Sequence, residues 1–364
     1  MIGPFERLVR PLLHALEPED AHALTLRMLK FAPPIGAVRD DKRLAVRAFG
    51  LNFPNPVGMA AGFDKNAEVP DVLLRLGFGF AEVGTITPRP QPGNPRPRVF
   101  RLQSDEGVIN RLGFNSQGAD VVLRRLAART NAGGIVGVNV GANKDASDRV
   151  ADYVRLIERF AAVASYVTVN ISSPNTPGLR ALQQAAALDD LLARVVDARE
   201  RVAPHAGPTP VLLKIAPDLS LAELDDVVGI ARLRRVDGMI VGNTTLARPP
   251  SLRDTKTAKE VGGLSGRPLF PLATRMLAET YVRVEGVFPL IGVGGIDSGS
   301  AALAKFRAGA GLIQLYSALV FRGLGLLGEI KAALIAAVDR DRLDSLNELV
   351  GADAAAVTAE PWPR

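Results

Sequence analysis

Eight short apolar runs, separated by longer segments, dominate the organisation of this sequence. They are Val57–Ala61, Phe80–Gly84, Ile135–Val140, Val167–Ile171, Val211–Ile215, Met239–Gly242, Leu290–Val293 and Leu312–Leu315. Because they are apolar nearly throughout, they are typical of parallel strands that are buried on both faces. Amphipathic segments such as Leu188–Val202 and Leu221–Leu233 follow most of the runs. Eight strand–helix units predict an α/β fold that closes into a (β/α)8 TIM barrel.

The length of the chain agrees with one barrel plus additions. A barrel of this kind takes about 250 residues, and the chain has 364. We predict a helical segment over residues 1–40, the barrel over 41–335, and a helix end with a tail over 336–364. The gap from Thr85 to Gly134 exceeds an ordinary connection, so it should hold an insertion over the barrel mouth. The end of the tail, through Trp362, is expected to fray.

Residues 1–40 predict a pair of short helices. Apolar residues recur at helical spacing from Phe5 to Leu16, and Pro18 suits the first turn of a second helix. Met28 and Phe31 continue an apolar face on that second helix. The two apolar stripes either pack on the main core or form a groove that faces lipid, and the sequence leaves both possibilities open.

The composition excludes several classes of protein. The chain has no cysteine and only three histidines, so disulfides, thiolate nucleophiles and thiolate or His-rich metal sites are not expected. It has no apolar stretch long enough to span a bilayer and no secretory signal, which favours the cytoplasmic side. The formal net charge of +6 suits a polyanion or an anionic membrane. A nucleic-acid-binding module remains an alternative, although aromatic residues are only 5% of the chain.

Polar residues follow the predicted strands at their C-terminal ends, where barrel enzymes carry their active sites. The set comprises Asp64, Lys65, Thr85, Asn139, Asn170, Lys214, Asn243, Thr244, Tyr316 and Ser317. After the seventh strand, Gly294 and Gly295 would let backbone N–H groups approach an anion, in the usual phosphate position of a barrel. Lys214, on a buried strand, could stabilise a reduced flavin, form a Schiff base as in an aldolase, or pair with a core carboxylate.

Five asparagines indicate the kind of ligand. Asn110, Asn139, Asn170, Asn175 and Asn243 each offer a planar donor and acceptor, and the edge of a pyrimidine ring alternates carbonyl and N–H groups. Turn positions are the alternative explanation for any one of these asparagines. The positive charge of Lys65, which follows the first predicted strand, suits a carboxylate on the ligand.

Ser173 needs a separate interpretation. A hydrolytic serine requires a histidine base, but His14 and His22 belong to the N-terminal helices and His205 precedes the fifth strand. The sequence therefore disfavours a Ser-His-Asp hydrolase. Ser173 is instead a candidate for receiving a proton from a substrate carbon, with Thr176 or water as the next carrier. A turn serine before a proline is the alternative.

Seven longer motifs surround these candidate residues. They are Ala60–Lys65, Gly84–Asn94, Asn110–Asn115, Asn170–Arg180, Lys214–Asp218, Gly262–Pro268 and Ile291–Ser298. Together they resemble the dihydroorotate dehydrogenase family, and most closely its class 2, membrane-associated, quinone-reducing members. The resemblance runs from about Pro4 to Gly323. It implies oxidation of dihydroorotate to orotate in pyrimidine synthesis, with FMN as hydride acceptor and a membrane quinone as final acceptor.

The same resemblance assigns roles to individual residues. Ser173 would remove the C5 proton while the C6 hydride passes to flavin N5; class 1 members use a cysteine base, which this chain lacks. The implied substrate shell is Lys65, Asn110, Arg111, Leu112, Gly113, Phe114, Asn170, Asn175, Asn243 and Thr244. The implied FMN shell is Ala61, Gly62, Phe63, Asp64, Lys65, Thr85, Asn139, Asn170, Lys214, Gly242, Gly266, Gly295, Tyr316 and Ser317. Gly242 is a departure, because the family commonly has a threonine there whose hydroxyl would contact FMN.

The resemblance also gives the N-terminal helices a role, since class 2 members use such a pair to reach the bilayer and admit quinone. His22, Arg101 and Tyr316 would line the quinone pocket. The four arginines Arg89, Arg96, Arg98 and Arg101 either form a basic cluster for anionic headgroups or belong to a solvated loop. We therefore expect a monomer in peripheral contact with the cytoplasmic face of the membrane, with no metal and no nucleic acid as partner.

Overall fold

A closed barrel of eight parallel strands forms the centre of the computed structural model, which describes residues 10–11, 13–31, 40–129 and 132–363. The strands are β3 (Val57–Met59), β4 (Phe80–Ile86), β7 (Ile135–Val140), β8 (Tyr166–Asn170), β9 (Val211–Ile215), β10 (Gly238–Val241), β12 (Leu290–Val293) and β13 (Leu312–Leu315). The barrel closes where β13 pairs with β3. All eight predicted strands and the predicted fold class are confirmed.

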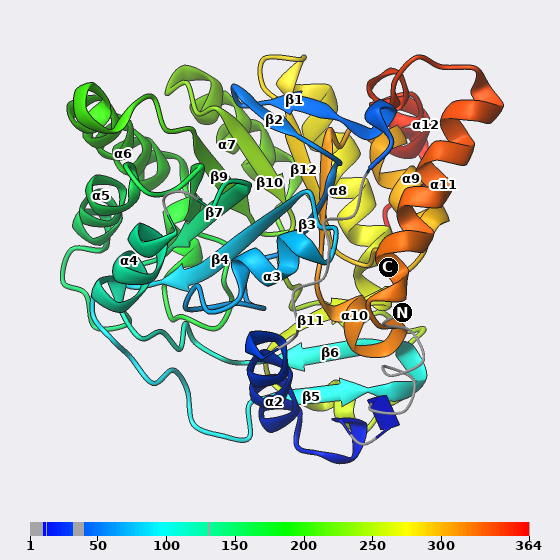
Figure 1. Ribbon diagram of the computed structural model, residues 1–364, viewed down its shortest axis with the longest axis horizontal. Coiled ribbons are helices and arrows are strands. Elements are labelled where there is room, and N and C mark those ends of the chain that lie inside the picture. The colour runs from blue at the N-terminus through cyan, green and yellow to red at the C-terminus, as the bar shows by residue number, and fades with distance from the viewer. Residues whose placement is uncertain (1–9, 12, 32–39, 130–131, 364) are drawn as a thin grey trace.

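Helices pack around the outside of this barrel (Figure 1). They are α3 (Pro70–Arg75), α4 (Ala119–Ala128), α5 (Arg149–Phe160), α6 (Ala185–Ala206), α7 (Leu221–Leu233), α8 (Phe270–Val284), α9 (Gly299–Arg307) and α11 (Gly325–Asp341). α7 has the predicted bounds because Ser220 and Glu223 form a capping box at its start. α6 continues beyond the predicted Val202, so His205 lies in its last turn and not in a loop.

A short hairpin closes the N-terminal end of the barrel. It consists of β1 (Val46–Ala48) and β2 (Leu51–Phe53). The Phe53 ring packs edge-to-face on Phe80 with centroids 5.2 Å apart, and Phe80 in turn contacts Tyr166. These rings fill the barrel at this end. Figure 1 shows the hairpin at the opposite end of the barrel from α2, β5 and β6, so the polar strand ends open on the other side.

The predicted insertion over the barrel mouth is confirmed. It contributes β5 (Val99–Leu102) and β6 (Gly107–Asn110), which form an antiparallel sheet with β11 (Gly263–Gly266). Helix α2 (Pro18–Lys30) packs on β5, and α10 (Ser317–Arg322) lies at the same end of the molecule (Figure 1). The Glu17 carboxylate caps α2 by accepting the backbone N–H of Glu19 at 2.8 Å.

Much of the first predicted helix falls on residues 1–9 and 12, which lie outside the described residues, whereas residues 13–15 are helical. In the described part of the chain, no helix combines the length and apolar character needed to cross a membrane. Phe31, at the end of α2, is 86% exposed, so the apolar face of this helix is not wholly covered by the barrel. The division of the chain at residues 40 and 335 stays a prediction.

The C-terminal segment does not fray as expected. It forms α12 (Ala354–Ala359), which packs against α8. The guanidinium of Arg275 donates to the carbonyls of Thr358, at 2.8 Å, and of Glu360, and it lies over the Trp362 ring at 5.0 Å from the centroid. A buried arginine that needs acceptors thus fixes the tail to the barrel.

Candidate active site

One large cavity of about 1530 Å³ opens at the C-terminal ends of the barrel strands. It extends from the strand ends to α2 and the inserted sheet. The predicted residues that line it are His22, Ala61, Gly62, Phe63, Lys65, Thr85, Arg101, Asn110, Leu112, Gly113, Phe114, Asn170, Ser173, Asn175, Lys214, Asn243, Thr244, Gly266, Gly295, Tyr316 and Ser317. The structure therefore brings almost all of the predicted site residues into one space.

Four predicted residues lie outside the cavity lining. The Asp64 carboxylate accepts backbone N–H groups, including that of Val69 at 2.8 Å, and so holds the loop after β3. Arg111 forms an ion pair with Glu260. Gly242 has a φ of +117°, and a Cβ there would meet the Val293 carbonyl oxygen at 3.0 Å, so this conformation favours glycine. The fourth, Asn139, is fully buried and donates from Nδ2 to the Glu82 carboxylate at 2.8 Å.

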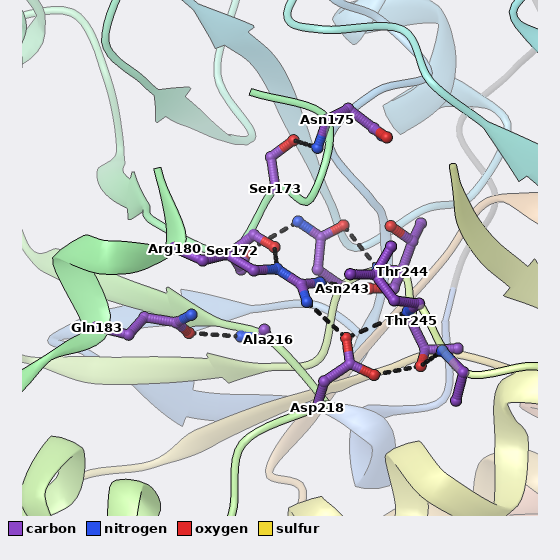
Figure 2. Close-up of polar contacts among 12 residues, drawn as sticks. Ser172, Ser173, Asn175, Arg180, Gln183, Ala216, Asp218, Asn243, Thr244 and Thr245 are labelled. Atoms are coloured by element: carbon purple, nitrogen blue, oxygen red, sulfur yellow. Dashed lines mark hydrogen bonds and ion pairs between the residues drawn. The ribbon is translucent and has the colours of Figure 1, made fainter. Parts of the chain in front are cut away.

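Ser173 lies in the loop after β8 and is 6% exposed. Its Oγ accepts the backbone N–H of Asn175 at 3.3 Å (Figure 2). Asn175 in turn donates from Nδ2 to Oδ1 of Asn110 at 3.3 Å, which connects this loop to β6 of the inserted sheet. Among the described residues no histidine is hydrogen-bonded to Ser173. The structure therefore agrees with the prediction against a Ser-His-Asp arrangement.

Arg180 links three loops that follow barrel strands (Figure 2). Its Nε donates to the Ser172 carbonyl at 3.0 Å, and one terminal nitrogen donates to the Thr244 carbonyl at 3.0 Å. The other terminal nitrogen forms an ion pair with Asp218 at 2.7 Å. Because these partners come from the loops after β8, β9 and β10, Arg180 fixes the residue before Ser173 relative to the neighbouring strand ends.

Two lysines in the cavity are affected by burial. Burial lowers the pKa of Lys65 to about 8, and the carboxylate of Glu19 opposes that change. Burial also lowers the pKa of Lys214, opposed by the charge of Glu82 inside the barrel. The Lys214 ammonium has no hydrogen-bond or ion-pair partner among the described residues, and its side chain lines the cavity. It is therefore available to a bound group.

At one end of the cavity the backbone is rich in glycine. Gly266, Gly294 and Gly295 all line it with positive φ values of +87°, +101° and +76°. The hydroxyls of Ser265 and Ser317 lie 2.8 Å apart at the same end. Small backbone units with adjacent hydroxyls suit an anionic oxygen-rich group such as a phosphate, and the assignment of this part of the barrel to a phosphate stays a prediction.

Beside α2 the cavity lining is mainly apolar and aromatic. His22 packs edge-to-face on Phe63, with ring centroids 5.4 Å apart, and Tyr316 contacts both rings. Burial lowers the pKa of His22 to about 3, so this imidazole is neutral at physiological pH. Burial also raises the pKa of the Tyr316 hydroxyl. Arg101 donates to the carbonyls of Leu13, His14 and Leu16, which ties the segment before α2 to β5.

The four arginines of the insertion do not form a free basic cluster. Arg89 pairs with Asp145, and Arg96 contacts both Asp20 and Glu19. Arg98 forms a part-buried two-point ion pair with Glu19, at 2.6 and 2.9 Å. Arg101 is bonded to backbone carbonyls. These partners occupy the guanidinium groups, so the arginines mainly hold α2 on the inserted sheet.

Sequence reasoning missed several residues around the cavity. Gln314 lines it, Glu82 lies buried beneath it, and Ser172 and Arg180 organise the loop that carries Ser173. The first two had a visible signal, because each is a polar residue inside an otherwise apolar strand. Ser172 and Arg180 fall inside a quoted motif without a distinguishing pattern of their own. No cluster of three or more metal-ligating side chains occurs in the described ranges.

Comparisons with known proteins point to one family. The family model "Dihydroorotate dehydrogenase" matches residues 43–338. The chain is 71% identical over 363 residues to dihydroorotate dehydrogenase (quinone) of Bradyrhizobium diazoefficiens and 72% identical to that of Rhodopseudomonas palustris, with 100% of each chain covered. Its fold is similar to a crystal structure of DHODH in complex with ferulenol from Eimeria tenella, with a TM-score of 0.88 and 37% identity. That match covers 94% of this chain and 98% of the other.

Proposed function

This chain belongs to the dihydroorotate dehydrogenase family, and we propose that it oxidises dihydroorotate to orotate with FMN as first electron acceptor and a membrane quinone as the last. As a quinone-dependent member, it is an oxidoreductase of pyrimidine biosynthesis. The observation that carries the proposal is one cavity that joins Ser173 and the strand-end amides to an apolar entrance beside α2. The aldolase and nucleic-acid alternatives have no support in these full-length relatives.

The family is flavin-dependent, and the side chains of the cavity suit FMN. Among the described residues, the Lys214 ammonium has no hydrogen-bond or ion-pair partner, and the buried Oε1 of Gln314 lacks a hydrogen bond. A flavin ring carries both carbonyl and N–H groups for such partners. The glycine-rich end with Ser265 and Ser317 suits the phosphate. When bound, FMN supplies a two-electron acceptor that takes hydride from substrate and gives electrons to quinone.

Side chains near Ser173 suit the substrate. The ammonium of Lys65 would pair with the substrate carboxylate, while the amides of Asn110, Asn175 and Asn243 would meet the carbonyl and N–H groups of the ring. These contacts would leave the C5 hydrogen facing the serine hydroxyl. Loss of a proton from C5 and of a hydride from C6 leaves the C5–C6 double bond of orotate, so charge and electrons balance.

Ser173 would receive the C5 proton. The backbone N–H of Asn175 donates to its Oγ and so stabilises negative charge there. The proton must then leave the serine. The Thr176 hydroxyl is buried and has no hydrogen-bond partner among the described residues, which makes it a candidate for the next carrier, alone or through water.

The apolar end of the cavity is proposed as the quinone site. His22, Arg101 and Tyr316 line it together with Leu24 and Met28 of α2. Because the arginines of the insertion are engaged, contact with the cytoplasmic face of the membrane would rest on exposed apolar residues at the ends of α2: Leu16 is 38% exposed and Phe31 86%. The proposed enzyme is a monomer in peripheral contact with the membrane.

Ser173→Ala tests the chemical part of the proposal. The variant should keep bound flavin but reduce it about 10²- to 10⁴-fold more slowly with dihydroorotate, because it lacks the base. Anaerobic stopped-flow absorbance measures this rate. Ser220→Ala, at the cap of α7 on the outside of the barrel, is the control. A Ser173→Ala rate equal to that of the control would remove Ser173 from the reaction.

A further inference from the structure

Glu82 is a carboxylate in the interior of the barrel, on β4, with 1% of its surface exposed. Four side chains donate hydrogen bonds to it: Asn139 Nδ2 at 2.8 Å, Gln314 Nε2 at 2.9 Å, Tyr166 Oη at 3.0 Å and Thr168 Oγ1 at 3.2 Å. A carboxylate that accepts four donors satisfies its lone pairs without a salt bridge. Its role in the barrel therefore depends on which groups it orients.

A directed chain of hydrogen bonds runs from Glu82 to the cavity. Asn139 Nδ2 donates to Glu82, and Asn170 Nδ2 donates to Asn139 Oδ1 at 3.0 Å. Ser172 Oγ then donates to Asn170 Oδ1 at 2.8 Å. Asn243 Nδ2 donates to Ser172 Oγ at 2.8 Å, and the backbone N–H of Thr244 donates to Asn243 Oδ1 at 2.9 Å. Figure 2 shows the end of this chain, where Asn243 meets Ser172 next to Ser173. Every donor in the chain points toward Glu82.

Both ends of the chain fix its direction. At the outer end, backbone N–H groups can only donate, and those of Ser172 and Thr244 face Asn170 Oδ1 and Asn243 Oδ1. At the inner end, the carboxylate of Glu82 can only accept. Asn139 therefore turns its NH₂ group inward and its oxygen toward Asn170, where that oxygen also accepts the Thr85 hydroxyl at 2.6 Å. Reversing one amide would set two donors against each other.

We infer that Glu82 is a positioning residue for flavin reduction: its carboxylate sets the orientation of the amides beneath the cavity and places a negative charge inside the barrel. The inference rests on the proposed function. Asn170 and Asn243 line the cavity and belong to the chain, and Ser172 precedes the proposed base. A shift in any of these groups therefore reaches the reacting atoms.

Glu82 also determines what Gln314 presents to a bound group. Because Gln314 Nε2 donates to Glu82, its Oε1 is left buried and without a partner in the described part of the chain. The side chain lines the cavity, and the end of its amide that faces away from Glu82 is an acceptor and not a donor. Lys214, on β9, offers a positive charge in the same cavity. A flavin would thus meet one cation and one acceptor, and Glu82 fixes the orientation of that acceptor.

Glu82→Gln removes the charge while preserving the shape of the side chain. A glutamine has one acceptor oxygen and one NH₂ group, so either Asn139 or Gln314 would face a donor. Whichever amide meets that donor must turn over, which either breaks the chain direction or presents an NH₂ group to the cavity. The loss of the negative charge should at the same time favour the more negative, reduced state of the bound flavin.

The test compares full-length flavin-loaded wild type, Glu82→Gln and Thr168→Val. Thr168→Val is the matched control, since it removes the longest hydrogen bond to Glu82 and leaves the chain intact. We expect Glu82→Gln to raise the equilibrium constant for reduction of the bound flavin about tenfold. This change corresponds to a shift of the flavin midpoint potential of about 30 mV to the positive side for two electrons. The limiting rate of anaerobic reduction by dihydroorotate should fall at least tenfold. The control should match wild type in both quantities.

Glu82→Gln values within threefold of the control, for both the rate and the reduction equilibrium, would overturn the inference and leave Glu82 a packing residue. A change in only one of the two would also contradict it, since charge and orientation must act together. If Glu82→Gln does not fold, Asn139→Leu keeps the charge and cuts the chain: the rate should fall while the potential stays, and an unchanged rate would contradict the inference. If dihydroorotate does not reduce the wild-type flavin at all, the proposed function fails instead.

Discussion

The hydroxyl of Tyr316 lies 3.3 Å from Nδ1 of His22, so the residue that follows the last barrel strand is hydrogen-bonded to helix α2. Phe63, from the loop after β3, packs against both rings. The three rings form one aromatic cluster that lines the cavity where the helix meets the barrel. A change in this cluster should therefore affect electron acceptors that enter beside α2 more than substrates that bind near Ser173.

His22→Leu should slow the reoxidation of reduced flavin by a short-chain quinone by about tenfold, the loss expected for one net hydrogen bond of about 1.4 kcal/mol. The reduction of flavin by dihydroorotate should change less than twofold. Stopped-flow measurement of each half-reaction checks this. Thr25→Val is the control, because Thr25 also lines the cavity from α2 but its hydroxyl has the Ala21 carbonyl as its one partner among the described residues. Equal losses in both half-reactions would show that His22 supports the whole barrel.

The neutral His22 also predicts a pH dependence of stability. Burial holds its pKa at about 3, below the ordinary value of 6.5. Between these values the unfolded chain binds a proton that the folded chain does not, so stability is complete above pH 6.5 and is lost as the pH falls toward 3. Over this window the Tm of wild type should fall more steeply than that of His22→Leu. Parallel Tm curves would contradict the assignment.

Arg180→Met should lower kcat by about 10- to 100-fold with flavin still bound, because the loop that carries Ser173 loses its links to Asp218 and to the Thr244 carbonyl. Arg180→Lys should rescue little, since one ammonium cannot replace three guanidinium contacts. Steady-state kinetics and flavin content measure these effects. Arg194→Met, which removes an exposed pair with Asp148, is the control and should leave kcat unchanged.

Arg98→Met should loosen α2 from the inserted sheet. It leaves the half-buried Glu19 carboxylate with Arg96 as its remaining ion-pair partner in the described part of the chain, and loss of the two charged hydrogen bonds should cost about 1–3 kcal/mol. Hydrogen exchange of the α2 amides should accelerate accordingly. The double variant Glu19→Leu with Arg98→Met should recover much of the protection, because no buried charge remains. Unchanged exchange in Arg98→Met would show that apolar packing alone holds the helix.

The barrel and most of the cavity lining could be predicted from the sequence. Apolar runs buried on both faces are a local signal, and parallel strands necessarily bring their polar ends to the same side. Lys214 and Asn170 could therefore be assigned to one site although they lie far apart in the chain. The boundaries of α7 were also predictable, because its capping box is a pattern of adjacent residues.

What could not be predicted depends on partners distant in sequence. Gln314 and Glu82 are 232 positions apart, and Arg98 and Glu19 are 79 apart, so neither pair leaves a local pattern. The sequence consequently left open whether the arginines of the insertion form a basic cluster or belong to a solvated loop, and in the structure Arg96 and Arg98 form ion pairs with α2. The tail was expected to fray because nothing near Trp362 indicates that the buried Arg275 requires it.

The central claim, that one cavity holds a flavin between a dihydroorotate site and a quinone site, has a direct test in the absorption spectrum of the purified protein. It should be yellow, lose its visible absorbance when dihydroorotate is added without air, and regain it when a quinone follows. A colourless protein that takes up no FMN, or a bound flavin that dihydroorotate does not bleach, would contradict the claim.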